Sequence, residues 1–442
     1  MPETHKLRKI SKEAVWIFSG QAVAIALQLL ALRLLTDALS VSEYGVLSLL
    51  LVSATLIERT LMVVQAGVGR YYLEAVQENK VKPYWFASMQ ILLRSSVLSL
   101  LVGLIIILVA SLLLPFNYQL PAVFILIAAI MSGWNAAFSG IILSARKRSS
   151  HALFQVIDFS CRLAFIFLFT SLLGLSLLGV SLAYMLAASF LLVLQHRSVI
   201  KLLGLTYNSS NEMSFKTDSL NSADWRHQIW TYSAPFFAWG GFSWMQQSSD
   251  RFALETFAGS PAVGFYSVIF QLGYTPMTIL GTMTITLIQP ILFSRALPKA
   301  SPSKNDHSLI QIPLASSVIL LLISAILALT AYKYHHSIFL IFVAEDFRSY
   351  SQLLPYAVLA GGVFAAAQPL GARLMATKNT IQIFWINTAF SFISIFFNFL
   401  GAYYYGIPGV VAALLISALC YWMLFILALN NLERRAILFR WF

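Results

Sequence analysis

Charged side chains interrupt the long apolar stretches of this sequence, and they are its best candidates for chemistry. Five arginines lie inside these stretches or at their ends: Arg33, Arg59, Arg94, Arg162 and Arg251. A guanidinium binds a phosphate or carboxylate group through two parallel hydrogen bonds. An unpaired charge in lipid is costly, so we expect these side chains to face protein or water. Together they predict a cavity that binds an anion carrying phosphate or carboxylate.

Acidic side chains accompany the arginines, and Glu58, Asp158 and Asp250 are the main ones. Each could hold a coupling proton or cation, or could simply neutralise a neighbouring arginine. Asp158 and Arg162 are four residues apart and could form a salt bridge within one helix. Arg33 lies near the end of its apolar stretch and could extend to the lipid headgroups. These alternatives are open at the level of the sequence.

Motifs of soluble enzymes are missing from the sequence. It has no Gly-x-Ser-x-Gly, no phosphate-binding loop and no His-Glu-x-x-His. The adjacent His335 and His336 are predicted to be solvated residues of an outer loop rather than a metal site. Cys161 and Cys420 both lie in apolar stretches, which excludes a disulfide framework and a cysteine metal site. We therefore expect no enzymatic activity, no cofactor and no metal.

The elements that must position these side chains are transmembrane helices. Of the 442 residues, 59% are apolar and 10% are charged, which is typical of a polytopic membrane protein. A bilayer core of about 30 Å requires roughly 20 apolar residues in a helix. Runs of this kind predict twelve spans: 14–36, 45–66, 84–113, 121–144, 153–173, 177–195, 228–257, 262–292, 309–331, 353–375, 380–402 and 408–429.

Positive charge is distributed unevenly between the two predicted sides. With the N-terminus inside, 22 of the 29 Lys and Arg residues fall on the inner side and three fall on the outer side. This asymmetry follows the positive-inside rule and places both termini in the cytoplasm. The net charge of +12 is then a consequence of topology, and no nucleic-acid partner is needed to explain it. We predict a multi-pass protein of the inner (plasma) membrane whose first helix is retained.

The longest hydrophilic segment, His196–His227, lies on the inner side with six spans before it and six after. It predicts an N-terminal lobe over residues 1–200, a flexible cytoplasmic linker over 201–227 and a C-terminal lobe over 228–442. An even number of crossings in each half gives both halves the same orientation. The axis relating them is then a pseudo-two-fold along the membrane normal.

Short sequence similarities accompany this repeat. Ser42–Leu47, at the start of the second span, resembles Ala262–Ser267 at the start of the eighth. The apolar segment Ser337–Ala344 is too short to cross a bilayer, so we expect an interfacial or re-entrant piece there. Spans seven and eight contain several helix breakers, which serve either gating motions or close packing. These breakers are Pro235, Gly240, Gly241, Gly264, Gly273, Pro276, Gly281 and Pro290.

Several of these segments resemble a known family. Val15–Gly20, Leu34–Gly45 and Gly67–Tyr72 are similar to segments of bacterial polysaccharide transporters of the oligosaccharide (O-antigen type) flippase kind. Asp250-Arg251 followed by Val263–Tyr266 is similar to their pattern in the second half. These transporters belong to the multidrug/oligosaccharidyl-lipid/polysaccharide exporter superfamily.

The resemblance implies an all-α, MATE-like fold of two six-helix lobes around a central cavity. It also implies flipping of a polyprenyl-pyrophosphate-linked oligosaccharide to the outer leaflet, for biosynthesis of lipopolysaccharide O-antigen or exopolysaccharide. Membrane lipid and other proteins of polysaccharide assembly are then candidate partners. Two alternatives are a multidrug or ion antiporter of the same superfamily and a membrane glycan polymerase or ligase. An antiporter for cationic drugs would favour carboxylates in its cavity, and a polymerase would need a large outer loop.

Overall fold

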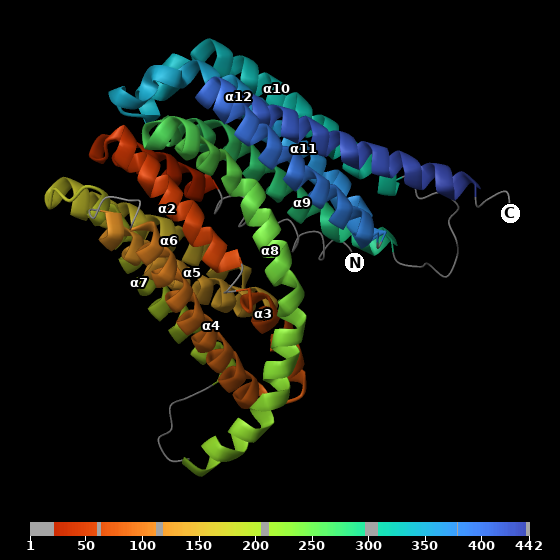
Figure 1. The fold of residues 1–442 in the computed structure, drawn as a ribbon. Helices are drawn as coiled ribbons and strands as arrows, with labels where there is room; N and C mark the ends of the chain where they lie inside the picture. The colour runs from red at the N-terminus through yellow and green to blue at the C-terminus, as the bar shows by residue number, and fades with distance from the viewer. Residues whose placement is uncertain are drawn as a thin grey trace. The chain divides into compact units, whose positions relative to one another are not determined.

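A computed structural model describes residues 22–59, 63–111, 118–204, 212–296, 308–377 and 379–438, and every element in them is helical, as predicted. A helix over residues 22–38 comes first. The helices that follow are α2 (Val41–Arg59), α3 (Gln65–Gln77), α4 (Val81–Ala110), α5 (Gln119–Ser144), α6 (Arg148–Phe167), α7 (Leu177–Leu203), α8 (Glu212–Ile269), α9 (Thr275–Ala296), α10 (Ser308–Phe342), α11 (Leu354–Ala376) and α12 (Thr380–Leu438) (Figure 1).

The described helices account for most of the predicted crossings. In the described ranges, nine helical segments are long and apolar enough to cross a membrane. Two of them, Ala223–Phe293 and Ile381–Leu429, each contain a glycine with a positive φ, Gly259 at 78° and Gly406 at 60°. Each glycine ends one helix and lets the chain turn into the next. Counting these two segments as two crossings each gives eleven. Residues 14–21 of the first predicted span, 14–36, lie outside the described residues, and a helix covers the rest of it.

Helix α10 corrects two expectations from the sequence. It runs without interruption to Phe342, so most of Ser337–Ala344 is its C-terminal end rather than a separate re-entrant piece. His335 and His336 lie in this helix and not in a loop, and His335 Nδ1 is 3.0 Å from Ser351 Oγ. The segment between residues 331 and 342 has no glycine or proline to end the helix. At 35 residues, α10 exceeds the roughly 20 residues that a bilayer core needs.

Two further boundaries differ from the sequence prediction. Helix α7 continues to Leu203 and α8 begins at Glu212, so much of the predicted flexible linker is helical. The described part of α2 runs to Arg59, and Val63 and Val64 form a turn before α3 begins at Gln65, so the expected span 45–66 is not one helix.

The chain forms two compact units. The first comprises residues 1–39 and 49–244, and the second comprises residues 40–48 and 245–442. The division at Trp244 and Met245 falls within α8, and the division after Ser48 falls within α2. Each of these two helices therefore contributes residues to both units.

The first unit is built around α5, which packs against α3, α4, α6 and α7. Its core includes Tyr84, Phe138 and Ile141, all fully buried. Gly69 of α3 and Gly140 of α5 face each other, so the two backbones approach closely.

The second unit is built around α11, which packs against α9, α10 and α12. Most of its residues are buried, and many are alanine or glycine. Helix α5 supplies the fourth predicted span and α11 the tenth. The two central helices thus occupy equivalent places in the two halves of the chain, as a repeat requires.

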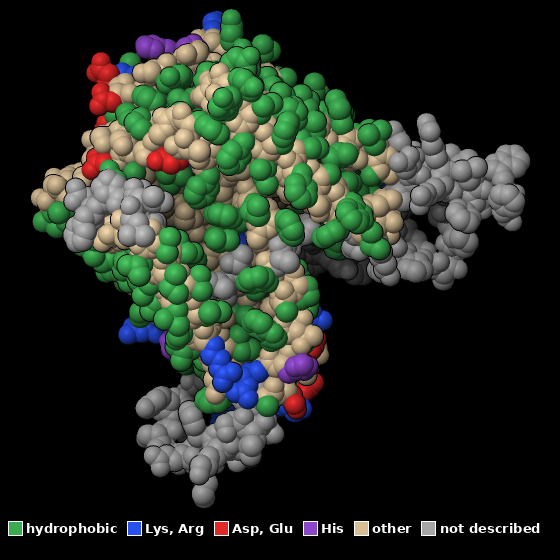
Figure 2. Space-filling model, in the orientation of Figure 1, with side chains coloured by type: hydrophobic (Ala, Val, Ile, Leu, Met, Phe, Trp, Pro, Cys, Tyr) green, Lys and Arg blue, Asp and Glu red, His purple; other side chains and the backbone are tan. Residues whose placement is uncertain are grey.

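The outer surface of the helices is apolar, as expected for contact with lipid. On α4, the side chains of Leu101, Ile105 and Leu108 are 56%, 60% and 70% exposed. Figure 2 shows hydrophobic side chains covering much of the face that it draws. In water such a surface would cause aggregation, whereas in a bilayer it is the favourable one.

Neighbouring glycines in α8 give the first testable prediction. A methyl group at Gly240 would overlap with the backbone carbonyl oxygen of Arg59, whereas one at Gly241 would meet nothing within 4 Å. We expect Gly240→Ala to lower the free energy of unfolding by about 1–3 kcal/mol through overpacking. Gly241→Ala should leave it unchanged or raise it by about 0.5–1 kcal/mol, because alanine favours a helix. Thermal unfolding of the two variants in detergent compares them, and equal melting temperatures would contradict this close packing.

Candidate functional site

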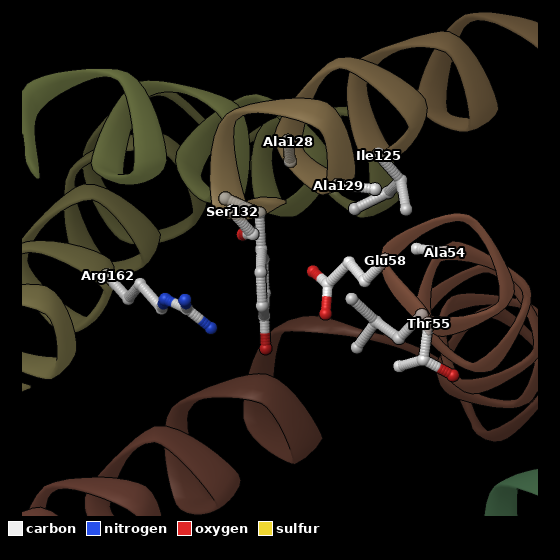
Figure 3. A pocket seen from close by; sticks show the side chains of 10 residues that line it. Ala54, Thr55, Glu58, Ile125, Ala128, Ala129, Ser132 and Arg162 are labelled. Atoms are coloured by element: carbon white, nitrogen blue, oxygen red, sulfur yellow. The ribbon is translucent and has the colours of Figure 1, made fainter. Parts of the chain in front are cut away.

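A cavity of about 370 Å³ lies within the first unit, where α2, α5, α6 and α7 meet (Figure 3). Its lining residues are Leu51, Ala54, Thr55 and Glu58 of α2, Ile125, Ala128, Ala129 and Ser132 of α5, Arg162 of α6 and Tyr184 of α7. The four residues on α2 and the four on α5 have the same spacing, i, i+3, i+4 and i+7. This spacing puts each set on one face of its helix.

The two helix faces explain why there is space here and why it is polar at one end. Alanines at three of the eight positions leave room that larger side chains would fill. Each face begins with a large apolar residue, Leu51 or Ile125, and ends with a polar one, Glu58 or Ser132. The cavity therefore has an apolar end and a polar end.

Arg162 supplies the positive charge at the polar end. Its Nε is 3.1 Å from Asp158 Oδ1 and its Nη2 is 2.7 Å from Asp158 Oδ2, which is a bidentate pair within α6. The guanidinium also lies over the ring of Tyr184, with its Cζ 5.3 Å from the ring centre. The salt bridge between Asp158 and Arg162, one of the alternatives open from the sequence, therefore forms. Arg162 also lines the cavity. A guanidinium fixed by a carboxylate and a ring is oriented before any ligand arrives.

Glu58 supplies a negative charge to the same cavity. Its carboxylate and the guanidinium of Arg162 point into the cavity from opposite sides (Figure 3). Arg162 exerts the strongest attraction on this carboxylate, followed by Arg59, and the Ser132 hydroxyl donates a hydrogen bond to it. Glu58 lies in the last described turn of α2, next to Arg59.

The charges around this cavity nearly balance. Asp158 pairs with Arg162, and Glu58 is opposed by Arg162 and, more weakly, by Arg59. The sequence predicted a cavity with an excess of arginines, and only Arg162 of the five lines this one. An anion would therefore bind here only when an acid is protonated or displaced from Arg162.

Three of the other arginines lie in the first unit away from the cavity. Arg33 Nε pairs with Asp37 Oδ2 at 2.9 Å, and Arg59 Nη1 donates a hydrogen bond of 3.1 Å to Ser243 Oγ. Arg94 is exposed on α4. None of the three lines the cavity. A single cavity lined by these arginines together with Arg162 stays a prediction.

The fifth arginine, Arg251, is buried in the second unit, where it is 8% exposed. Its Nη1 is 3.2 Å from both carboxylate oxygens of Asp250, which is 2% exposed. Its Cζ lies 4.5 Å from the ring centre of Phe270, and Tyr266 donates a hydrogen bond to Asp250. Asp250 and Arg251 thus form a pair with several supporting contacts, and a role in binding substrate or a coupling ion stays a prediction.

Thr55, Ser132 and Tyr184 were not among the residues expected from the sequence. The spacing that α2 and α5 share is the sequence pattern that could have indicated Thr55 and Ser132. On each helix, small residues are followed one turn later by a polar residue. In the described part of the chain, no group of three or more His, Cys, Asp or Glu residues could hold a metal ion.

The fold is similar to that of solved transporters. The similar structures include the inward-facing conformation of a multidrug resistance MATE family transporter of the MOP superfamily, at 14% identity and a TM-score of 0.68, covering 95% of this chain and 99% of that one. They also include the lipid II flippase MurJ in an inward closed conformation, at 14% identity and a TM-score of 0.68, covering 95% of this chain and 87% of that one.

A third similar structure is a MOP superfamily transporter from Pyrococcus furiosus, at 14% identity and a TM-score of 0.60, covering 96% of both chains. Its structure is described as having a binding pocket of reverse polarity that suggests a different function. No protein-family model matches the sequence, and no curated protein matches it. The likeness is therefore one of fold: an all-α, multi-pass membrane protein of the MATE-like type.

Proposed function

We propose that this chain, which has the fold of MOP superfamily transporters, is a flippase for a lipid-linked oligosaccharide. Its substrate is a polyprenyl-pyrophosphate-linked glycan, which it moves by alternating access from the cytoplasmic to the outer leaflet of the inner membrane. Both termini are cytoplasmic, as the distribution of Lys and Arg favours. The transported glycan serves surface polysaccharide biosynthesis.

The observation that carries this proposal is the oriented guanidinium of Arg162 at the polar end of the first-unit cavity. Pyrophosphate offers oxygens that match the two-pronged geometry now occupied by Asp158. Thr55, Ser132 and Tyr184 add hydroxyl groups suited to phosphate or sugar oxygens. The lipid tail needs no such site, because it remains in the bilayer during transfer. The MurJ structure, a lipid II flippase, gives this fold a precedent for a lipid-linked cargo.

Coupling to an ion follows from the charge balance of the cavity. Phosphate would displace Asp158 from Arg162, and protonation of Glu58 would remove the repulsion between that phosphate and the carboxylate. Deprotonation of Glu58 would restore that repulsion, expel the anion and let Asp158 pair with Arg162 again. In this scheme a proton, or a monovalent cation at Glu58, exchanges for the substrate. Asp250 is a third candidate for this role from the sequence, and its close pairing with Arg251 makes it the weaker one.

Leaflet transfer in reconstituted vesicles tests the proposal directly. Purified protein is inserted into liposomes containing a fluorescent polyprenyl-pyrophosphate-linked oligosaccharide, and an impermeant quencher or lectin reports the leaflet in which the glycan lies. We expect transfer that is fast compared with protein-free liposomes. Properly folded protein that transfers no glycan, with or without a pH or sodium gradient, would argue against a flippase.

A second candidate function is a drug or ion antiporter, and Glu58 is the observation that favours it. A carboxylate facing the cavity could bind an organic cation instead of a proton. Export of a cationic dye from the same vesicles, competing with proton movement and lost in Glu58→Gln, would support it. A flippase predicts that Glu58→Gln alters the pH dependence of glycan transfer and that no dye is exported. The longest hydrophilic segment lies on the predicted inner side, whereas a polymerase or ligase would need a large outer loop.

A further inference from the structure

Arg94 lies on the face of α4 that should contact lipid. It is exposed, and the residues at i+4, i+7, i+11 and i+14 from it share its face of the helix. These residues are Leu98, Leu101, Ile105 and Leu108, and all four are exposed. Since a charged residue at membrane depth almost always faces the protein interior, an arginine in this stripe needs a partner. In the part of the chain that the structure describes, Arg94 has no hydrogen-bonding or ionic partner.

The position of Arg94 along α4 places it near one edge of the hydrocarbon core. The helix ends at Ala110, 16 residues after Arg94, which is about 24 Å along the axis. With Ala110 at one edge of a core of about 30 Å, the Cα of Arg94 lies about 6 Å inside the other edge. Side chains lean toward the N-terminus of their helix, so the guanidinium reaches the headgroup phosphates at this edge. On the proposed topology, these headgroups belong to the cytoplasmic leaflet.

A second guanidinium, that of Arg226 on α8, lies next to this position. Arg226 Nη1 donates a hydrogen bond to Gln90 Oε1. Gln90 is four residues before Arg94 on α4, and side chains at this spacing are neighbours on one face of a helix. Neither arginine has an ionic partner in the described ranges. Two like charges thus lie near each other without an acid, and an anion bound by both would remove their repulsion.

Packing within the first unit holds the two helices together at this level. The rings of Tyr84 on α4 and Trp225 on α8 meet edge to face with their centres 5.8 Å apart, and both side chains are buried. The Tyr84 hydroxyl also donates a hydrogen bond to the carbonyl oxygen of Val68 on α3. Figure 1 shows α8 passing alongside α3 and α4 here. The arginines are therefore positioned by a packed interface.

Trp230 gives an independent indication of depth. It is four residues after Arg226 on α8, and its side chain is 54% exposed. Exposed tryptophans are enriched where the hydrocarbon core meets the headgroups. The length of α4 and the position of Trp230 thus place the two arginines at the same edge of the bilayer.

We propose that Arg94 and Arg226 bind the phosphate of a cytoplasmic-leaflet lipid on the outside of the first unit, and that this lipid ties α4 to α8. Two guanidiniums match the oxygens of a phosphate group, which lipid headgroups supply at this depth. This assigns Arg94 to a lipid-facing site separate from the cavity at Arg162. The phosphate belongs either to an anionic phospholipid or to the pyrophosphate-linked substrate. The first source is independent of the proposed function, and only the second rests on it.

Lipid binding to purified protein in a neutral detergent tests the site. Phosphatidylglycerol labelled on an acyl chain is the probe, and its fluorescence anisotropy reports binding. We expect Arg94→Gln with Arg226→Gln to weaken binding about tenfold or more. Arg94→Gln alone removes no contact within the described chain and should weaken binding about threefold or more. The matched control is Arg197→Gln with Lys201→Gln, which removes two exposed positive charges from the end of α7 and should change binding less than about twofold.

Equal binding by the two double variants would overturn the site, because the attraction would then be a general effect of charge. A second copy of this chain is the competing partner for Arg94. If Arg94→Gln converted a dimer into a monomer by light scattering and left phosphatidylglycerol binding unchanged, the lipid site would be wrong.

Competition distinguishes the two sources of phosphate. Polyprenyl pyrophosphate without a glycan is added to the complex with labelled phosphatidylglycerol. Displacement of the probe would show that the group carried by the proposed substrate shares this site, and retention of the probe would assign the site to phospholipid. Absence of glycan transfer by the unmodified protein would count against the proposed function. Loss of phosphatidylglycerol binding in Arg94→Gln would still support the lipid site in that case.

Discussion

Replacing Arg251 with alanine should lower the free energy of unfolding by about 3–5 kcal/mol, the largest stability effect that we expect for a single side chain. The substitution leaves Asp250, 2% exposed, without its ionic partner. It also removes the cation from above the Phe270 ring and the hydrogen bond to Ser48. The chain would have to bury an unpaired carboxylate, or protonate it. Thermal or chemical unfolding in detergent measures the effect.

Arg33→Ala is the matched control for this prediction. Arg33 also pairs with an acid, Asp37, at 2.9 Å, but the two side chains are 36% and 45% exposed. Exposed pairs of this kind contribute about 0–1 kcal/mol. Replacing both partners with similarly sized apolar residues, as in Asp250→Leu with Arg251→Met, should recover much of the stability lost in Arg251→Ala. An Arg251→Ala variant as stable as Arg33→Ala would show that the pair is not buried as described.

Replacing Arg162 with alanine should weaken binding of the pyrophosphate-linked substrate by roughly 10–100-fold, the loss expected for charge-assisted hydrogen bonds to phosphate. Arg162→Lys should recover only part of the binding, because an ammonium group cannot make the two parallel hydrogen bonds. Binding to protein in detergent and leaflet transfer in vesicles give the two readouts. Unchanged binding in Arg162→Ala would remove this arginine from the proposed substrate site.

Variants of Asp158, the acid that pairs with Arg162, distinguish a loss of substrate binding from a loss of folding. Arg162→Ala alone leaves Asp158, 15% exposed, without its partner. In Arg162→Ala with Asp158→Asn the aspartate charge is removed together with its partner, so this double variant should fold normally and still fail to bind. Asp158→Asn alone frees the guanidinium and should bind substrate more tightly.

The membrane-spanning architecture could be predicted from sequence because its determinants are local. A bilayer sets one length for every span, and Lys and Arg mark one side, so runs of apolar residues and their flanks suffice. Helix ends that lie in water rather than in lipid were harder to predict. Helix α10 continues past its apolar stretch through Lys333 and His336, because nothing in that segment ends a helix. A turn at Val63 and Val64 divides the second apolar stretch, 45–66.

The candidate site could be predicted only in part, because it depends on which helices become neighbours. The pairing of Asp158 with Arg162 follows from a spacing of four residues. The approach of Glu58 to Ser132, by contrast, joins two helices that are far apart in sequence. Arg162 and Arg251 have similar surroundings in sequence, each close to an aspartate in an apolar stretch. One faces a cavity and the other is buried, and only tertiary packing distinguishes them.

The composition of α11 has a consequence for how this protein enters the membrane. As the centre of the second unit, α11 is rich in alanine and glycine, and it is less apolar than α10 before it and α12 after it. Insertion from the translocon depends on large apolar side chains, which α11 has mainly at a few positions. Helices α10 and α12 cover much of its surface, so a truncation after α11 would expose buried alanines and glycines to lipid and remove one of the helices that α11 packs against.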